Sequence, residues 1–578
     1  GKRDNSQRDR GKTINRHLSG NITEKLKKIA KEYSVTDNML FVAATMILLH
    51  FYGNQSDIVL GIPISGRTLQ ETENILGMFV NTLALKSKVD ETINFGDYLE
   101  QIKNMCIKAY ENQEYPFDEL IADLKLGGDM QTNPLFNVML TFHQSEKDNL
   151  RFADSKIEQL DGNNNIVKFD LTFHIAYMSE GGEIGVEYRE DLFDNSTIHR
   201  ILKQYMMVLN QIACNKNIKI SNIEIVTDDE KDLVNSINKT EFGWKNQDNV
   251  IDMFEKRVSE NPNGIALYQE DITMTYYELN QRANILAEKL RSVGVGRNDY
   301  VAIKGYRNME MIISILGVLK AEAAYIPIDP SAPERREKHI LEDSKPKVVL
   351  LCGSKIEADI SLINVSSEDK LGGVIKENLK RNVDMDSPVY CIYTSGTTGN
   401  PKGVIIQHGA LRNYINYAKA NYVETNPIIP FFTNFSFDLT VTSLYLSLCC
   451  GGTLVIFDDS KSVLDVVQSY PKHLYTFMKM TPEHLNLLLK ADLGMKMPSL
   501  RTLVLGGEAL KRELCIETLN EIGNQIAIHN EYGPTEATVG CADYIFNPGD
   551  DSFYVSIGKP ISNVQMYVVN CNRLCGIG

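Results

Sequence analysis

The sequence predicts a multidomain α/β protein, and three observations lead to that prediction. Its 578 residues are 43% hydrophobic and 23% charged, which excludes disordered and low-complexity classes and leaves ample core material. At about 150 residues per domain, a chain of this length forms three or four compact units. A polar stretch, residues 228–248, separates two regions whose hydrophobic patterns differ.

The first region, residues 1–227, mixes helical and strand patterns. Helical pattern covers residues 22–33, 39–51 and 198–213, whereas the apolar runs 58–64 and 182–188 are typical of strands. This mixture indicates an α/β or α+β domain. The polar residues 228–248 that follow are rich in Asn, Lys and Thr and are interpreted as an interdomain linker.

The second region, residues 249–578, alternates helices with short apolar strands, which predicts mainly parallel sheets covered by helices. The expected helices are 277–293 and 309–320, and the expected strands are 300–303, 348–351, 389–393, 453–457 and 503–505. Within residues 277–293, apolar residues recur every three or four positions, so one stripe is expected to face the core. Its members are Leu279, Ala283, Leu286, Leu290 and Val293.

The net charge limits the kinds of binding partner to expect, and the cysteine pattern indicates the cellular compartment. The balance of 60 Lys and Arg against 75 Asp and Glu gives a net charge of −15, which argues against nucleic acid and anionic lipid as partners. The ten cysteines form no CxxC pair, as expected for reduced thiols of a cytoplasmic protein. The longest uncharged run, residues 439–457, is broken by two glycines and predicts a buried helix followed by a strand, not a membrane span.

A glycine-rich loop, residues 393–403, carries the strongest chemical signal. It follows an expected strand and combines three glycines and four hydroxyl residues with Lys402. Glycines let the backbone approach an anion, hydroxyl groups donate hydrogen bonds, and lysine supplies charge, so the loop suits phosphate. The alternative is an ordinary Gly/Ser/Thr turn that binds no phosphate. A Walker A loop is disfavoured because position 401 is Pro and position 403 is Gly.

The segment TSGTTGNPKG resembles the phosphate loop of adenylate-forming enzymes, which include acyl-CoA synthetases, luciferases and the adenylation domains of nonribosomal peptide synthetases. Four further segments resemble core motifs of the last group, in the same order. They are residues 275–279, 319–329, 437–440 and 530–536. One departure is Glu322, where that family usually has glycine. The resemblance implies the large subdomain of an adenylation domain at residues 249–578, truncated before the small C-terminal subdomain.

The resemblance implies that the protein uses ATP and Mg²⁺ to convert an amino acid into an aminoacyl-AMP, which is then transferred to the 4′-phosphopantetheine thiol of a carrier domain outside this chain. By the same analogy Lys402, Thr535 and Glu536 are catalytic. Glu536 ligates Mg²⁺ through a hard oxygen, and Tyr532 stacks on adenine. The nucleotide-binding set is Thr394, Ser395, Gly396, Thr397, Thr398, Gly399, Lys402, Gly403, Asn530, Tyr532 and Gly533.

Asp438 follows an apolar aromatic stretch, and a buried carboxylate there needs a partner. In the family the matching aspartate binds the substrate's α-ammonium group; the alternative is a helix N-cap, since the next ten residues have a helical pattern. The positions that match the family's specificity pocket are Asp438, Leu439, Thr442, Lys479, Val504, Gly506, Glu531, Val539 and Gly540. This set resembles pockets that select L-asparagine.

The chemistry of two of these residues fits asparagine. Lys479 can donate to a side-chain carbonyl, Glu531 can accept from an amide NH₂ group, and aspartate would be repelled by Glu531. The alternative is that Lys479 and Glu531 pair with each other across a small cavity, because buried ions seek partners.

Segments of the first region resemble the C-terminal half of a condensation domain, which has a chloramphenicol-acetyltransferase-like fold. They are residues 61–67, 77–82, 115–120 and 134–137. The catalytic HHxxxDG signature belongs to the other half, and no His-His pair occurs in the sequence, so Arg67, Asn81 and Asp118 are interpreted as structural. The expected partners are the missing condensation half, the missing C-terminal adenylation subdomain and peptidyl or aminoacyl carrier domains. The alternatives are an acyl- or aryl-CoA ligase and a degenerate scaffold module.

Overall fold

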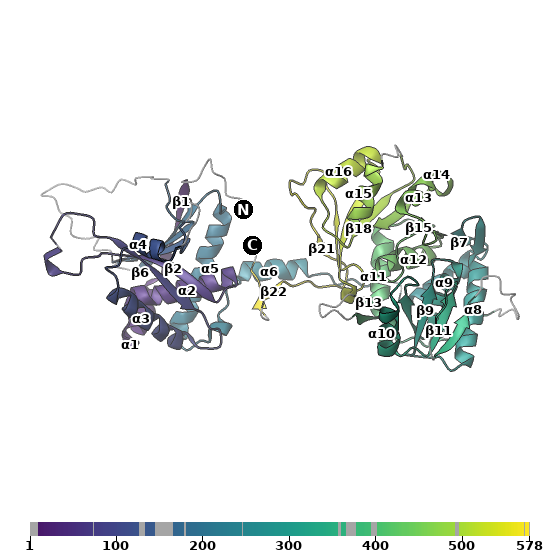
Figure 1. The fold of residues 1–578 in the computed structure, drawn as a ribbon, viewed down its shortest axis with the longest axis horizontal. Coiled ribbons are helices and arrows are strands. Elements are labelled where there is room, and N and C mark those ends of the chain that lie inside the picture. The colour runs from purple at the N-terminus through teal and green to yellow at the C-terminus, as the bar shows by residue number, and fades with distance from the viewer. Residues whose placement is uncertain are drawn as a thin grey trace. The chain divides into compact units, whose positions relative to one another are not determined.

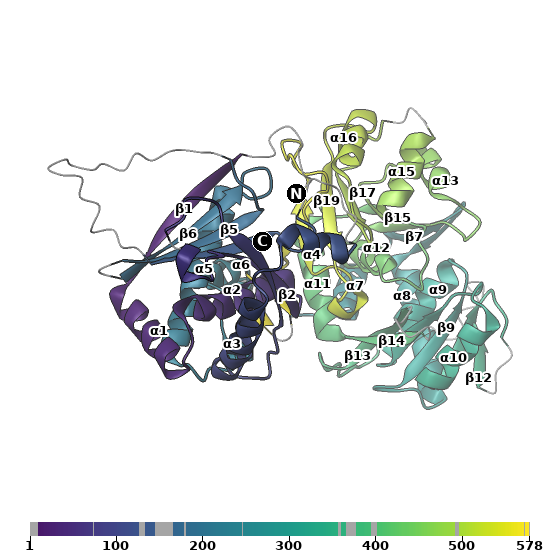
Figure 2. The same cartoon turned by 60° about the vertical axis from the view of Figure 1, so that its left-hand side comes forward.

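The computed structural model divides the chain into two compact units, Gly1–Val234 with Tyr567–Gly578, and Asn235–Met566. Figures 1 and 2 trace both units, which are described separately below. The structure describes residues 10–72, 74–125, 133–144, 166–178, 181–245, 247–356, 360–365, 377–394, 401–491, 496–570 and 573–576. The expected loop residues Ser395, Gly396, Thr397, Thr398 and Gly399 lie outside this set.

The first unit is built on a mixed sheet of six strands in the order β1-β6-β5-β4-β2-β3. The strands are β1 (Gly11–Leu18), β2 (Asp57–Ile64), β3 (Asn81–Lys88), β4 (Val138–Gln144), β5 (Leu171–Met178) and β6 (Gly181–Arg189). Strand β4 runs parallel to both β2 and β5, and the other pairs are antiparallel. A short hairpin, β22 (Val569–Asn570) and β23 (Arg573–Leu574), completes the unit.

Helices α1 (Gly20–Glu32), α2 (Asp37–Gly53), α3 (Phe95–Glu111) and α5 (Asn195–Cys214) gather along one side of this sheet (Figure 2). The unit also contains helix α4 (Phe117–Asp123) and the short turns η1 (Gln70–Thr72) and η2 (Ile220–Asn222). Helix α2 is buried over eleven of its residues and packs between α3, α5 and β2, which explains its apolar character all round. The hydroxyl of Thr36 accepts from the Met39 N–H and caps its first turn.

Arg67 and Asn81 bind backbone carbonyl groups of the first unit. The Arg67 guanidinium donates to the carbonyls of Thr72, Ile75 and Gly77 and lies 4.3 Å from the centre of the Phe79 ring. The Asn81 amide donates to the carbonyls of residues 113 and 115, at 2.9 and 2.8 Å. Both side chains therefore hold backbone groups that have no partner in a helix or sheet.

The second unit contains three sheets that are parallel except at their edges. The first is β12-β11-β9-β10-β13-β14, the second is β15-β16-β7-β8, and the third is β17-β18-β19-β20-β21. The strand bounds are β7 (Ile265–Gln269), β8 (Ile272–Thr275), β9 (Tyr300–Gly305), β10 (Ala324–Ile328), β11 (Val348–Cys352), β12 (Ser361–Asn364), β13 (Pro388–Thr394), β14 (Lys402–Gln407), β15 (Ile428–Phe431), β16 (Thr453–Ile456), β17 (Phe477–Met480), β18 (Thr502–Gly506), β19 (Ala527–Tyr532), β20 (Ala542–Ile545) and β21 (Lys559–Pro560). The predicted α/β architecture with mainly parallel sheets is confirmed.

The helices of this unit are α7 (Val250–Glu260), α8 (Tyr276–Ser292), α9 (Met309–Lys320), α10 (Glu334–Ser344), α11 (His408–Asn421), α12 (Leu439–Cys449), α13 (Val463–Gln468), α14 (Tyr470–His473), α15 (Pro482–Lys490), α16 (Arg512–Glu521) and the turn η3 (Thr535–Ala537). Helix α12 is buried and contacts β15, β16 and β17, so it joins two of the sheets. The predicted helix and strand within residues 439–457 are thus α12 and β16.

In helix α8 the apolar stripe predicted from the sequence matches the buried residues at all but one position. Thr275 and Glu278 form a capping box at its start, and the predicted stripe is buried at Leu279, Ala283, Leu286 and Leu290. The prediction for Val293 is wrong, because this residue is the C-cap and is 48% exposed. The chain leaves the helix direction there, so helical spacing no longer places the side chain over the core.

The polar stretch expected as a linker is largely structured. Its first ten residues form helix α6 (Asp228–Ile237). Beyond the helix the chain is bound to the second unit: Asn238 exchanges hydrogen bonds with the backbone of Met566, and the Trp244 indole N–H donates to the Asn413 side chain at 2.8 Å. Side-chain partners on a folded surface thus order a segment whose composition alone indicates flexibility.

Two further observations concern cysteines and membrane spans. The nine cysteines within the described ranges are all free. No single helix among the described residues is long and apolar enough to cross a membrane, and α1 with α2 reach that length only as a pair bent by 106°.

Candidate functional site

Asp438 lies at the start of α12 but does not cap it. It holds the N-cap position with a helical backbone, and its side chain makes no capping hydrogen bond. Its Oδ2 atom is buried without a hydrogen-bond partner. A buried, unpartnered carboxylate oxygen is costly, and the missing capping hydrogen bond argues against the N-cap alternative for this residue.

The surroundings of Asp438 have opposing effects on the pKa of its carboxyl group. Burial raises the pKa of its carboxyl, while a hydrogen bond from the Thr535 hydroxyl and the charge of Lys479 lower it, and the net shift is upward. The carboxylate therefore gains from any cation that reaches Oδ2. The bond to Thr535 also ties Asp438 to the turn η3, which contains Glu536.

The predicted side-chain pocket is assembled by three neighbouring parallel strands. In the register of the third sheet, Lys479 of β17 lies opposite Val504 of β18, and Gly506 of β18 lies opposite Glu531 of β19. Because side chains two positions apart share a face of a strand, these four residues face the same side of the sheet. Thr442 on α12 joins them from the helix that covers this face.

Lys479 and Glu531 contact each other directly in a buried ion pair, as the second of the two sequence alternatives expects. Their relative exposures are only 1% and 5%. The ammonium group of Lys479 also donates to the hydroxyl oxygens of Thr442, at 2.8 Å, and Tyr414, at 3.2 Å. With three partners for its three N–H groups, Lys479 is fully satisfied.

Two tyrosines complete this cluster, and the sequence analysis missed both. The Tyr414 hydroxyl, on α11, donates to Glu531 Oε1 at 2.7 Å and lies 2.6 Å from the Thr442 hydroxyl. The Tyr422 hydroxyl donates to the same carboxylate oxygen at 3.1 Å. Tyr414 and Tyr422 lie far from the matching motifs in sequence, and only the packing of α11 against α12 brings Tyr414 to the pocket.

Glycines give Glu531 the space it occupies. A Cβ atom at Gly540 would lie 2.4 Å from Glu531 Cδ, and one at Gly506 would lie 2.9 Å from the Glu531 carbonyl oxygen. Val539, next to Gly540, has a left-handed backbone with φ of 68°, which is unusual for a β-branched residue. The positions predicted for substrate selection thus include the close backbone approaches that shape the pocket.

The groups predicted to bind nucleotide are more open to solvent. Lys402 begins β14, directly opposite Thr394 of β13, and β14 contacts the turn η3. Lys402, Gly403 and Glu536 are exposed, and the Tyr532 side chain is 45% exposed. The turn η3 contacts β14, the strand of Lys402, and its Thr535 bonds to Asp438. The cationic Lys402 and the anionic Asp438 therefore lie in one region of the second unit.

Two residues of the predicted nucleotide set have evident local roles. The Asn530 amide donates to the carbonyls of Val555 and Ser556, at 3.2 and 2.9 Å, and so fixes the segment that follows β20. A Cβ atom at Gly533 would lie 2.5 Å from the Val539 carbonyl oxygen, so only glycine permits this close approach. Leu439, the first residue of α12, is half-buried beside Asp438.

A cavity of about 650 Å³ adjoins this region within the second unit. Its lining includes Tyr414, Thr538 and Gly540, together with Trp244 of the ordered linker. Among the described residues no group of three or more His, Cys, Asp or Glu side chains is arranged to hold a metal ion.

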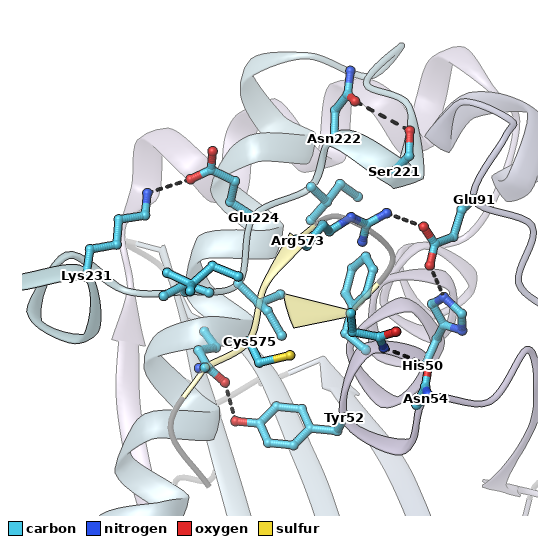
Figure 3. A pocket seen from close by; sticks show the side chains of 18 residues that line it. His50, Tyr52, Asn54, Glu91, Ser221, Asn222, Glu224, Lys231, Arg573 and Cys575 are labelled. Atoms are coloured by element: carbon cyan, nitrogen blue, oxygen red, sulfur yellow. Dashed lines mark hydrogen bonds and ion pairs between the residues drawn. The ribbon is translucent and has the colours of Figure 1, made fainter. Parts of the chain in front are cut away.

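Another cavity, of about 660 Å³, lies in the first unit and contains none of the predicted site residues. Figure 3 shows Glu91 between His50 and Arg573, with both side chains directed at its carboxylate. His50 Nε2 lies 2.8 Å from Glu91 Oε1, and Arg573 pairs with Oε2. These groups satisfy one another and leave no unpaired charge for a ligand.

Comparison with known proteins identifies both units. The AMP-binding enzyme family matches residues 254–577, and the condensation domain family matches residues 2–234. Bacitracin synthase 1 of Bacillus licheniformis is 32% identical over 98% of this chain, and gramicidin S synthase 2 of Aneurinibacillus migulanus is 32% identical over 96%. The chain spans only 11% and 12% of those two relatives.

Solved structures of nonribosomal peptide synthetases have a fold similar to that of this chain. A four-domain nonribosomal peptide synthetase, holo-AB3403 bound to AMP and glycine, superposes with a TM-score of 0.82 at 25% identity, over 98% of this chain and 44% of that one. The synthetase FmoA3, in a form bound to α-methyl-L-serine-AMP, shares the fold with a TM-score of 0.86 at 18% identity, over 98% of this chain and 65% of that one.

Fold and site together define a two-domain α/β protein with a condensation domain ahead of an AMP-binding domain. The chain belongs to the AMP-binding enzyme family and, within it, to the nonribosomal peptide synthetases.

Proposed function

We propose that this chain activates an amino acid, L-asparagine, as aminoacyl-AMP at the expense of ATP, for loading onto a carrier-protein phosphopantetheine thiol. The single observation that carries the proposal is the buried, unpartnered Oδ2 of Asp438 near the buried cluster of Lys479, Thr442 and Glu531. An α-amino acid supplies the ammonium group that this oxygen lacks, whereas a fatty or aryl acid does not.

The reaction joins two anions, so it depends on positioning and on charge neutralisation. Asp438 holds the substrate by its ammonium group, which leaves the α-carboxylate free to attack the α-phosphorus of ATP. Lys402 would offset the negative charge of the phosphates, and the Thr535 hydroxyl would lie near the α-phosphate. Glu536 would hold Mg²⁺, which supplies further neutralisation when bound, and its exposed carboxylate fits a hard, partly hydrated cation. Tyr532, with an exposed ring, would stack on adenine.

Selection of asparagine follows from the buried ion pair. A carboxamide that inserts between Lys479 and Glu531 replaces one contact by two, because its carbonyl accepts from Lys479 and its NH₂ group donates to Glu531. Aspartate would bring a second carboxylate against Glu531. The direct pairing of the two residues and the selection of asparagine are therefore compatible.

The first unit would join an upstream acyl or peptidyl thioester to the activated amino acid, together with a second condensation half and carrier domains. Its match to the condensation family and the matching relatives, which are synthetases, support this part of the proposal.

Amino-acid-dependent exchange between ATP and pyrophosphate, measured on the intact synthetase module, tests the proposal. We expect exchange with L-asparagine, weaker exchange with L-aspartate and none with fatty or aryl acids. Exchange driven by a fatty acid would instead support an acyl-CoA ligase, and no exchange with any of the twenty amino acids would support a non-catalytic scaffold. Either result contradicts the proposal.

A further inference from the structure

We propose that Tyr414 is a specificity-determining residue of the amino-acid pocket, beyond the nine positions predicted from the sequence. Its hydroxyl accepts from one N–H group of Lys479 and donates to one oxygen of Glu531. The pair is then left with one donor and one acceptor for a substrate, which suits a carboxamide. The inference rests on the proposed function, because it concerns the side chain that this pocket selects.

Lys479 has three N–H groups, and each has a partner in the cluster. They point to Tyr414, Thr442 and Glu531. A substrate that enters between Lys479 and Glu531 takes over only the last of them, so Lys479 offers it one donor. One donor satisfies a carbonyl oxygen, whereas a carboxylate carries two oxygens that both need donors in a buried site.

Glu531 shows the complementary arrangement. Its Oε1 atom accepts from the hydroxyls of Tyr414 and Tyr422, while Oε2 accepts from Lys479. When a substrate replaces the contact with Lys479, Oε2 becomes free to accept from an NH₂ group. The two tyrosines keep Oε1 turned away from the substrate, so a single acceptor faces a single donor.

The positions of these hydroxyls are fixed by burial. Tyr414 and Tyr422 are both among the largest fully buried side chains of the protein. The Tyr422 ring packs edge-on against His529, with ring centres 4.9 Å apart, and against Tyr417, at 5.8 Å. Tyr414 is held from the other side by Thr442, 2.6 Å away. Neither hydroxyl can leave the cluster without losing a buried hydrogen bond.

The test compares Tyr414→Phe with the wild type in exchange assays on the intact module, with L-asparagine and L-aspartate as alternative substrates. Removing the hydroxyl frees a second N–H group of Lys479, so we expect KM to rise for asparagine and to fall for aspartate. The ratio of the two kcat/KM values should drop at least tenfold, with little change in kcat. A residue that only stabilises the fold would lower both kcat/KM values in parallel.

Tyr445→Phe is the matched control, because Tyr445 is equally buried on α12 but its hydroxyl bonds only to Tyr325, 3.4 Å away. It should leave the ratio unchanged. Thr442→Val provides a second route if Tyr414→Phe is poorly folded, since it also frees one N–H group of Lys479 and should also improve aspartate. A ratio within twofold of the wild type in a folded Tyr414→Phe or Thr442→Val variant overturns the inference. Wild-type exchange without any preference for asparagine contradicts the proposed function instead.

Discussion

The two sides of the proposed adenylation site differ in how they hold charge. On the amino-acid side Lys479, Glu531 and the tyrosine hydroxyls form a closed, buried network with every described donor partnered. On the nucleotide side Lys402, Glu536 and Tyr532 are exposed. Buried charges are costly and must be held in one arrangement, whereas exposed charges can adapt to a large anionic ligand. Under the proposed function, the contrast places amino-acid selection in the core and nucleotide binding at the surface.

Asp438 should show the largest effect, because its Oδ2 atom is buried and has no hydrogen-bond partner among the described residues. Asp438→Asn keeps the shape but removes the charge that would pair with the substrate's ammonium group. Losing one partner of such a pair costs about 3–5 kcal/mol, so kcat/KM for the amino acid should fall by about 10²- to 10³-fold or more in the exchange assay.

The matched control for this change is Asp551→Asn, which alters an exposed carboxylate outside the site and should have no effect. If Asp438→Asn retained the wild-type KM for asparagine, the assignment of the ammonium site would be wrong.

The buried pair also predicts a large effect on stability. Lys479→Met leaves Glu531 as an uncompensated buried charge, so the free energy of unfolding of the second unit should fall by about 3–5 kcal/mol. Adding Glu531→Gln removes that charge and should restore part of the loss. Urea unfolding followed by circular dichroism measures both, with Lys402→Ala as the exposed counterpart, for which a change within about 0.5 kcal/mol is expected. Equal losses in Lys479→Met and Lys402→Ala would remove the distinction between the two sides.

Lys402 should matter for the nucleotide and not for the amino acid. A hydrogen bond to a charged group contributes about 1.5–3 kcal/mol, so Lys402→Ala should raise KM for ATP by about 10- to 100-fold. KM for asparagine should stay unchanged, because the two sides bind separate ligands. Steady-state exchange at varied ATP and varied asparagine separates the two constants, and a parallel rise in both would argue that the sides are coupled.

Glu531→Gln should weaken discrimination more than activity. An amide at this position accepts from the substrate NH₂ group but no longer repels a carboxylate, so the preference for asparagine over aspartate should fall about tenfold, or about 1.4 kcal/mol. Competition between the two amino acids in one exchange reaction measures this ratio. An unchanged ratio would show that Glu531 does not face the substrate.

The smallest effect concerns pH. The substrate's ammonium pairs with ionised Asp438, so kcat/KM for the amino acid should fall as pH falls through the raised pKa of this carboxyl. Thr535 donates a hydrogen bond that lowers this pKa, so Thr535→Val should move the acid limb to higher pH. The profile of kcat/KM against pH for both proteins checks the direction, and a shift to lower pH would contradict the assigned bond.

Much of the architecture could be predicted from local pattern. Helix α9 occupies the predicted residues 309–320, and the strands β9, β11, β13, β16 and β18 fall on the predicted apolar runs. These strands were predictable because each is a short, continuous apolar run, the pattern of a strand buried on both faces, and α9 is likewise apolar and buried along its length. The motif segments likewise indicated the family that the comparisons confirm.

Glu322 occupies a backbone conformation that usually requires glycine. Its φ is 68°, the left-handed region that favours glycine, which explains why the family usually has glycine there. The Glu322 carboxylate accepts from Arg291 at 3.2 Å, so a side chain is tolerated and used. The sequence indicated the departure, and the backbone gives its reason.

What the sequence by itself determined was the order of elements and the family, and it led to the residues proposed for both ligand sides. Only the tertiary structure decided which of those residues meet: that Asp438 leaves its helix uncapped, that Lys479 pairs with Glu531, and that Tyr414 reaches both. These contacts join strands and helices far apart in the chain, and periodicity within one segment carries no information about its partner across the core.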